Sequence, residues 1–199
     1  MPADVWDVVN EAIDWTAGRG FHVRENSVWA AVPNYIHKAF KAARRADPNA
    51  LLFYNDFRFE VNEGKLNYLV EMIKEMQEKN VPIDGVGIQF HVGPNSRWNE
   101  WNNGGWPITR ETTAKVIRTI GNLGLQVHIT EIDVDLCSNP PCDVNDEELL
   151  DAQAKMYQDA FAACYYDNPD FCTAFISWGF YDPHSWLHDT SYPLYFNDA

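Results

Sequence analysis

The sequence predicts an α/β fold of the (β/α)8-barrel type, incomplete in this chain, with about five β/α units and parallel strands. Apolar strand-like runs alternate with amphipathic segments, and polar residues follow each run at its carboxyl end. A doubly wound sheet is disfavoured because no G-x-G-x-x-G turn follows the first run. Eight units typically need about 250 residues, so we expect 1–199 to form one partial barrel domain.

Five apolar runs are expected to be the strands. They are continuous rather than alternating, as is typical of parallel strands covered by helices. In chain order the predicted strands are 5–11, 51–56, 85–91, 126–134 and 174–180.

Four helices are expected between these strands. Pro33 fits the first turn of the first helix, and Asp47-Pro48 ends it. Apolar residues with helical spacing mark the second helix: Leu66, Leu69, Val70, Ile73 and Met76. The predicted helices are 33–46, 63–79, 109–122 and 147–166.

Charge and composition limit the classes of partner. Lys and Arg total 15 against 29 Asp and Glu, so the net charge is −14. This charge disfavours nucleic acid and anionic membrane surfaces and suits a neutral substrate such as a carbohydrate, and acidity that serves solubility alone is the equally favoured interpretation. No apolar run reaches the roughly 18 residues of a membrane helix, and the first residues lack the basic start and apolar core of a signal peptide.

The four cysteines form two local pairs, Cys137 with Cys142 and Cys164 with Cys172. Metal sites prefer closer pairs, often with histidine, so two short disulfide loops are the preferred interpretation over a metal site. Disulfides imply an oxidising compartment, and we therefore expect an extracellular protein. We expect no cofactor and no metal.

Two carboxylates end strands that lie three units apart, Glu11 and Glu131. In a curved barrel wall these strand ends face each other, and facing carboxylates are what glycoside hydrolysis needs. Glu131 and Asp133 share one face of their strand, as do Gln89 and His91. We expect His91 to bond Glu131 and Asp133 to hold His91. A purely structural ion-pair network is the alternative.

Several longer motifs carry a family resemblance. They are WDVVNEAI (6–13), ARRADPNALLFYND (43–56), VPIDGVGIQFH (81–91), GLQVHITEIDV (124–134) and FISWGFYDPHSW (175–186). In this order and spacing the chain resembles the family ten glycoside hydrolases, the endo-β-1,4-xylanase family, and PLYFN (193–197) is similar to the family's closing segment. The resemblance covers the family's strands four to eight.

The resemblance implies a retaining hydrolase that cleaves xylan or xylo-oligosaccharides by double displacement. Glu11 would be the general acid and then base, and Glu131 the nucleophile. Supporting and substrate-binding roles would fall on Asn10, Tyr54, Asn55, Gln89, His91, Asp133, Trp178 and Trp186.

These supporting residues would divide the cleft between them. Asn10 would contact the hydroxyl next to the reacting carbon, and Tyr54 and Asn55 would lie on the leaving-group side. Trp178 and Trp186 would present flat apolar faces to sugar rings.

The chain departs from the family pattern in two places. Phe57-Arg58 stands where the family often has Tyr-Asn. The loop 92–108 contains Trp98, Trp101 and Trp106, which would form an additional sugar platform or pack the loop onto the barrel, and both interpretations stay open.

In the family, the first three strands carry residues that grip the sugar on the non-leaving side, whereas this sequence begins at the fourth strand. One hypothesis is a hydrolase whose open strand edges pair with another copy, giving a homo-oligomer. The other is a carbohydrate-binding or catalytically weakened remnant, and a truncated chain is a third interpretation.

Overall fold

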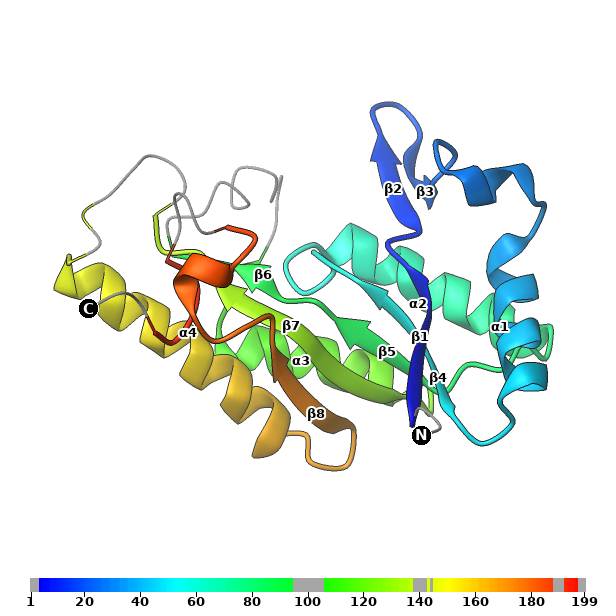
Figure 1. Ribbon diagram of the computed structural model, residues 1–199. Coiled ribbons are helices and arrows are strands. Elements are labelled where there is room, and N and C mark those ends of the chain that lie inside the picture. Colours follow the sequence, from blue (N-terminus) through cyan, green and yellow to red (C-terminus); the bar gives the residue numbers. More distant parts are fainter. Residues whose placement is uncertain (1–3, 95–105, 138–142, 144, 188–191, 197–199) are drawn as a thin grey trace.

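A computed structural model describes residues 4–94, 106–137, 143, 145–187 and 192–196 (Figure 1). Parallel strands form the main sheet in the same order as they occur in the chain. They are β1 (Val5–Asn10), β4 (Leu51–Asp56), β5 (Gly85–Ile88), β7 (Gln126–Val134) and β8 (Cys172–Ser177). A doubly wound sheet reverses its strand order, so this sequential order supports the barrel type.

The predicted strands are confirmed, with differences at the ends of the first, third and last: β1 ends at Asn10, and β8 begins at Cys172. The third run is split into β5 and the short β6 (His91–Val92), which also pairs with β7. Phe90 between them has a φ of 66°, which interrupts the ladder. The last strand ends before Gly179, whose φ is 115°, and not at position 180.

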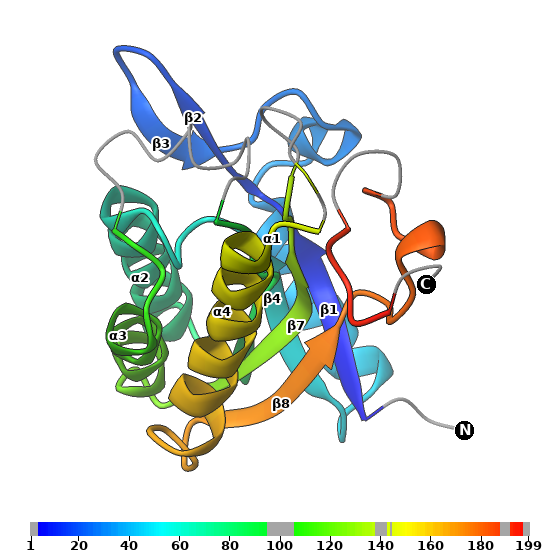
Figure 2. The same cartoon turned by 90° about the vertical axis from the view of Figure 1, so that its left-hand side faces the viewer.

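The four predicted helices are α1 (Tyr35–Ala46), α2 (Glu63–Glu78), α3 (Arg110–Gly121) and α4 (Glu147–Tyr165). The last three begin at residues whose side chains accept hydrogen bonds from the first turn, Asn62, Thr109 and Asp146. α1 begins after Asn34, two residues later than Pro33. Figure 2 shows α2, α3 and α4 along the same side of the sheet.

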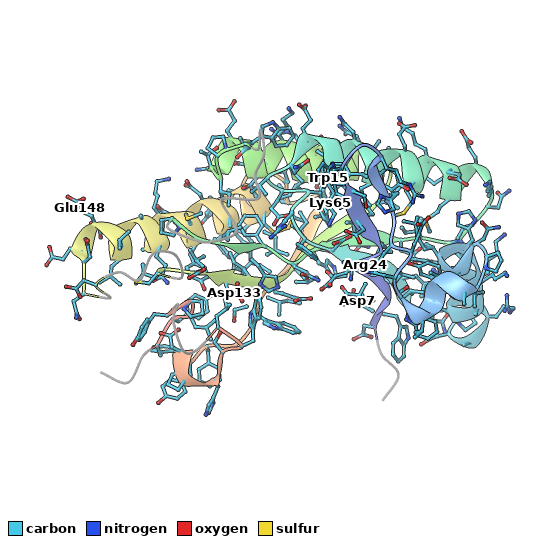
Figure 3. The ribbon with its side chains drawn as sticks, turned by 90° about the horizontal axis from the view of Figure 1, so that it is seen from above. Asp7, Trp15, Arg24, Lys65, Asp133 and Glu148 are labelled. Atoms are coloured by element: carbon cyan, nitrogen blue, oxygen red, sulfur yellow. A yellow bond between two sulfur atoms is a disulfide. The ribbon has the colours of Figure 1, made fainter. Side chains whose placement is uncertain are left out.

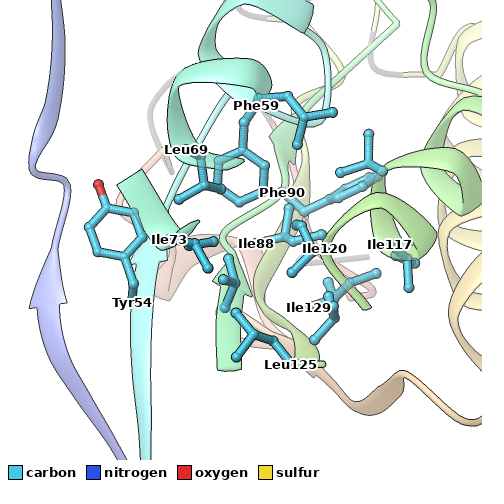
Figure 4. Packing of buried hydrophobic residues seen from close by; sticks show 14 of the residues in the cluster. Tyr54, Phe59, Leu69, Ile73, Ile88, Phe90, Ile117, Ile120, Leu125 and Ile129 are labelled. Carbon is cyan, nitrogen blue, oxygen red and sulfur yellow. The ribbon is translucent and has the colours of Figure 1, made fainter. Parts of the chain in front are cut away.

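The core lies between the sheet and these helices (Figure 4). Strands and helices both contribute fully buried side chains to one cluster, among them Leu52, Ile88 and Ile129 from strands and Leu69, Ile73, Ile117 and Ile120 from helices. Burial of this apolar face attaches the helices to the sheet and leaves the carboxyl ends of the strands for the site.

A hairpin that we did not predict follows β1. It consists of β2 (Ile13–Thr16) and β3 (Gly20–Val23), and a short 3-10 helix follows at Val28–Ala31. The turn uses Gly18 and Gly20, whose φ values of 80° and 81° suit glycine. Each strand is too short for its alternation to stand out in the sequence.

The sheet is open among the described residues, since β1 pairs only with β4 and β8 only with β7. The parallel sheet with its helices is therefore an incomplete barrel. Within the described ranges, no helix is long and apolar enough to cross a membrane.

The disulfide between Cys164 and Cys172 is confirmed and joins the end of α4 to the start of β8. Cys137 is also disulfide-bonded, whereas Cys142 lies outside the described residues.

Candidate active site

Glu11 follows the last residue of β1 and has an unusual backbone. Its φ is 53°, in the left-handed region, and its backbone nitrogen donates to the carbonyl oxygen of Asn55 at 2.9 Å. A non-glycine residue in a sparsely populated backbone region costs about 1–3 kcal/mol and is kept where its surroundings determine it. The backbone thus sets the direction in which the Glu11 carboxylate points.

Glu131 lies within β7, and its partners come from β4, on the far side of β5, and from the adjacent β6. The Asn55 Nδ2 donates to Glu131 Oε1 at 2.7 Å, and the His91 Nε2 lies 3.2 Å from Glu131 Oε2. The Glu131 side chain is 13% exposed. It is therefore held on both oxygens while keeping access to solvent.

Three amide side chains connect the two carboxylates. Gln89 Nε2 donates to Glu11 Oε1 at 3.0 Å and to Asn10 Oδ1 at 3.1 Å. Asn55 Nδ2 donates to the same Asn10 oxygen at 3.0 Å and to Glu131. The structure therefore places Glu11 and Glu131 in one continuous hydrogen-bond network.

His91 forms both hydrogen bonds that we expected. Its Nδ1 lies 2.8 Å from Asp133 Oδ1, and its Nε2 faces Glu131. Burial lowers the pKa of His91, but the bonds to Asp133 and Glu131 together outweigh burial and raise it to about 9. At neutral pH the ring is therefore a cation that donates from both nitrogens.

The two predicted sugar-binding tryptophans lie near this network and are half exposed, Trp178 at 50% and Trp186 at 51%. The Trp186 Nε1 donates to Asp133 Oδ2 at 2.8 Å, and its ring meets His91 edge to face at 5.2 Å. Trp186 therefore reaches the network through Asp133 while half of its surface stays exposed.

The tryptophan-rich loop is described only at its end, since Trp98 and Trp101 lie outside the described residues. Trp106 packs against the core cluster, and Lys115 Nζ lies 4.3 Å from the centre of its ring. Its backbone nitrogen also donates to the carbonyl oxygen of Val61 at 2.9 Å. For Trp106 the structure favours packing of the loop over a sugar platform.

Tyr54 does not lie where we expected it. Its side chain is 0% exposed and points into the core (Figure 4) instead of the leaving-group side of the cleft. Tyr54 and Asn55 are adjacent on β4, so their side chains point to opposite faces of the sheet, and only Asn55 reaches the site.

The structure adds charged residues that the sequence analysis missed. Arg24, from the segment after β3, places its Nη1 4.0 Å from Glu11 Oε2. Burial and the negative charge of Glu131 raise the pKa of Asp7 on β1. Figure 3 shows Asp7, Arg24 and Asp133 from above. The sequence offered a signal for Asp7, which is a carboxyl group within an apolar strand. It offered none for Arg24, because the segment after β3 has no periodic pattern.

The surface beside Glu11 is hollowed. A cavity of about 650 Å³ is lined by residues of β1, the segment after β3 and α1, including Asn10, Glu11, Arg24, Trp29 and Tyr35. In the part of the chain that is described, no group of three or more His, Cys, Asp or Glu side chains is arranged to hold a metal ion.

Two carboxylates toward the carboxyl ends of parallel β/α strands, joined by amides and a histidine, form the kind of arrangement that glycoside hydrolysis uses. The profile of Glycosyl hydrolase family 10 matches residues 3–199, and the chain belongs to this family.

Two relatives of the chain are named as xylanases. The chain is 36% identical over 198 residues to endo-1,4-beta-xylanase B of Neocallimastix patriciarum, covering 98% of this chain and 20% of the relative. It is 36% identical to endo-1,4-beta-xylanase B of Thermotoga neapolitana, covering 92% of this chain and 47% of the relative. The chain thus spans less than half the length of these relatives.

Solved structures agree with this assignment. Native xylanase 10B from Thermotoga maritima is 35% identical with a TM-score of 0.80, and the match covers 98% of this chain and 55% of that one. Xylanase 10C from Cellvibrio japonicus in complex with xylopentaose is 32% identical with a TM-score of 0.80, covering 98% and 40%.

Proposed function

We propose that this chain is the catalytic part of a retaining endo-β-1,4-xylanase, corresponding to strands four to eight of the family's barrel. The observation that carries the proposal is the network of Asn10, Asn55 and Gln89 that joins Glu11 to Glu131. The related structures with bound xylopentaose and xylobiose support xylan or xylo-oligosaccharides as the substrate.

In the proposed reaction, Glu131 attacks the anomeric carbon while Glu11 gives its proton to the leaving glycosidic oxygen. The glycosidic bond breaks and a Glu131 ester with the sugar forms. Glu11, now ionised, takes a proton from a water molecule as the water oxygen attacks the anomeric carbon; the bond from that carbon to Glu131 breaks, the sugar leaves with its original configuration, and Glu11 is again protonated and Glu131 again a carboxylate. Retaining enzymes keep two such groups roughly 5–5.5 Å apart.

Several supporting side chains prepare Glu131 for this attack. The cationic His91 and the Asn55 amide both donate to it, which holds one carboxylate oxygen on each partner and orients the group. Trp178 and Trp186 offer half-exposed rings against which sugar faces stack.

Reducing-sugar release from xylan tests the function. We expect release by the parent chain, none by Glu131→Ala, and parental release by Glu111→Ala, which removes an exposed glutamate at the start of α3. Equal release by the parent and Glu131→Ala would contradict the proposal.

The alternative is a carbohydrate-binding or weakened remnant, because the half-exposed rings of Trp178 and Trp186 are available to sugars whether or not the two carboxylates act. Retention of the parent chain on insoluble xylan without any sugar release supports this alternative. Loss of retention in a Trp178→Ala variant would then assign xylan binding to the surface at the carboxyl end of β8, where Trp178 lies.

We also propose self-association through the sheet edges. Support comes from the one-sided pairing of β1 and β8 and from exposed apolar side chains near them, Trp6, Ile176 and Phe180. Size-exclusion chromatography with light scattering tests it, and a well-folded monomer refutes it.

An extracellular location is the last part of the proposal. The disulfide between Cys164 and Cys172 supports it, since such bonds persist in oxidising compartments. Thiol titration of the denatured native protein, isolated without reductant, is expected to find no free thiol at these two positions.

A further inference from the structure

A buried hydrogen-bond cluster lies beside the backbone that follows Glu11. The Tyr54 hydroxyl accepts from the backbone nitrogen of Ala12 at 3.1 Å and donates to Asp56 Oδ2 at 2.5 Å. The same Asp56 oxygen accepts from the backbone nitrogen of Ile13 at 3.4 Å. Two consecutive peptide groups after Glu11 are thereby tied to β4.

Asp56 is itself held in place by its second oxygen. Lys65 Nζ, from the first turn of α2, donates to Asp56 Oδ1 at 2.8 Å, and the backbone nitrogen of Phe57 donates at 2.8 Å. The Asp56 and Lys65 side chains are 0% and 6% exposed. A buried ion pair is retained at little cost only when its groups are all hydrogen-bonded, and here both Asp56 oxygens have partners.

The cluster completes the restraint on Glu11. The nitrogen of Glu11 is bonded to Asn55 O, and the carbonyl oxygen of Ala12 accepts from the Arg24 nitrogen at 2.7 Å. With Ala12 N bonded to the Tyr54 hydroxyl, the chain is fixed on both sides of a residue whose φ is 53°. Without that bond, Glu11 is free to relax to an ordinary φ, and its carboxylate turns away from Gln89.

We propose that Tyr54 and Asp56 are positioning residues for Glu11: they hold the Glu11–Ala12 peptide so that the Glu11 carboxyl group faces the leaving glycosidic oxygen. This inference rests on the proposed function, in which Glu11 is the general acid. Neither side chain touches substrate, since both are fully buried. A general acid works only within hydrogen-bond reach of the oxygen it protonates, so a small displacement lowers the rate.

The test compares two substrates with Tyr54→Phe, which removes only the hydroxyl. A xylo-oligosaccharide needs the proton of Glu11, whereas a dinitrophenyl xylobioside has a leaving group that departs without one. We expect Tyr54→Phe to lower kcat/KM on the oligosaccharide by about 10- to 100-fold and to change kcat/KM on the aryl substrate, which reports only the first step, by less than about twofold. The control Tyr157→Phe, which removes a partly buried hydroxyl bonded to Pro193 O, is expected to leave this ratio unchanged.

Amide hydrogen exchange gives a readout that does not depend on activity. In Tyr54→Phe the Ala12 amide is expected to exchange about fivefold faster or more, since it loses one hydrogen bond, whereas Tyr157→Phe leaves it unchanged. If Tyr54→Phe does not fold, Asp56→Asn replaces it as the test variant. Its NH2 group takes the place of the oxygen that accepts from the Ile13 nitrogen, so the Ile13 amide hydrogen is expected to exchange faster.

Two outcomes in Tyr54→Phe overturn the inference. One is an unchanged rate of amide hydrogen exchange at Ala12, and the other is an equal fold loss of kcat/KM on both substrates. Failure of the proposed function looks different. In that case the parent chain itself releases product from neither substrate, while the exchange measurement still shows whether Tyr54 holds the Ala12 peptide.

Discussion

The side-chain amide of Asn55 donates to Glu131 Oε1 at 2.7 Å, although 76 positions separate the two residues. The amide orientation is determined by a second bond, because the Thr130 hydroxyl donates to Asn55 Oδ1 at 2.8 Å. The Asn55 Nδ2 must therefore face Glu131. The proposed nucleophile thus meets a hydrogen-bond donor and not the amide oxygen.

Replacing this donor by a carboxylate tests its electrostatic role. In Asn55→Asp a second negative charge faces Glu131, which disfavours ionisation of both carboxyl groups. We expect the acidic limb of the pH dependence of kcat/KM to move to higher pH, with a lower maximum. Asn122→Asp, the same change at the exposed end of α3, is the control. An unmoved acidic limb in Asn55→Asp would show that the amide has no such role.

Gly87 leaves the space that Asn55 occupies. A Cβ added at Gly87 would lie 2.3 Å from Asn55 Oδ1 and 2.8 Å from Thr130 Cγ2. We therefore expect Gly87→Ala to displace the Asn55 amide and lower kcat about 10-fold or more, as a misplaced catalytic group does. Measurement of kcat together with the thermal midpoint checks this, and a folded variant with parental kcat contradicts it.

His91 makes stability depend on pH in a defined direction. Its pKa of about 9 in the folded protein exceeds the ordinary 6.5, so the stabilisation is complete below 6.5 and is lost as the pH rises through 9. This difference corresponds to roughly 3 kcal/mol. We expect the unfolding free energy of the parent to fall over this interval, and His91→Gln to flatten the fall in urea titrations.

His128 provides the matched comparison. Burial lowers the pKa of His128, so its contribution has the opposite sign and is lost as the pH falls below 6.5. His128→Gln should therefore leave the fall between 6.5 and 9 in place. A parental pH dependence in His91→Gln would rule out the assignment to His91.

Glu60 is expected to destabilise the fold at neutral pH. Its side chain is 2% exposed, and its carboxyl oxygens have no side-chain hydrogen-bond partner among the described residues; the backbone amides of Glu60 and Arg58 lie near enough to oppose the effect of burial. Burial raises its pKa, so the unfolding free energy falls as the pH rises from the ordinary 4.5 through the folded-state pKa. We expect Glu60→Gln to raise the melting temperature at pH 7 more than at pH 4.

The control for Glu60 is Glu78→Gln, the same change at the exposed end of α2. It should shift the melting temperature equally little at both pH values. A lower melting temperature of Glu60→Gln at pH 7 would mean that the ionised carboxylate stabilises the fold, contrary to this expectation.

Much of the fold was predictable because the signals are local. Helical spacing placed α2 over Leu66, Leu69 and Ile73, and continuous apolar runs placed the strands. The hairpin after β1 was not predicted, because its strands are only four residues long. The carboxyl-end rule for β/α barrels identified Glu11 and Glu131 as a pair, since it depends on strand order and not on side-chain contacts.

By itself, the sequence determined the order of strands and helices and the two carboxylates at the strand ends, because periodicity and strand polarity are properties of neighbouring residues. Only the tertiary structure decided which side chains meet. Most of β4 is buried on both faces, so burial alone does not distinguish Tyr54, which faces the core, from Asn55, which faces Glu131. The approach of Arg24 to Glu11 and the space left by Gly87 likewise arise between distant segments, where packing and not local pattern sets the distances.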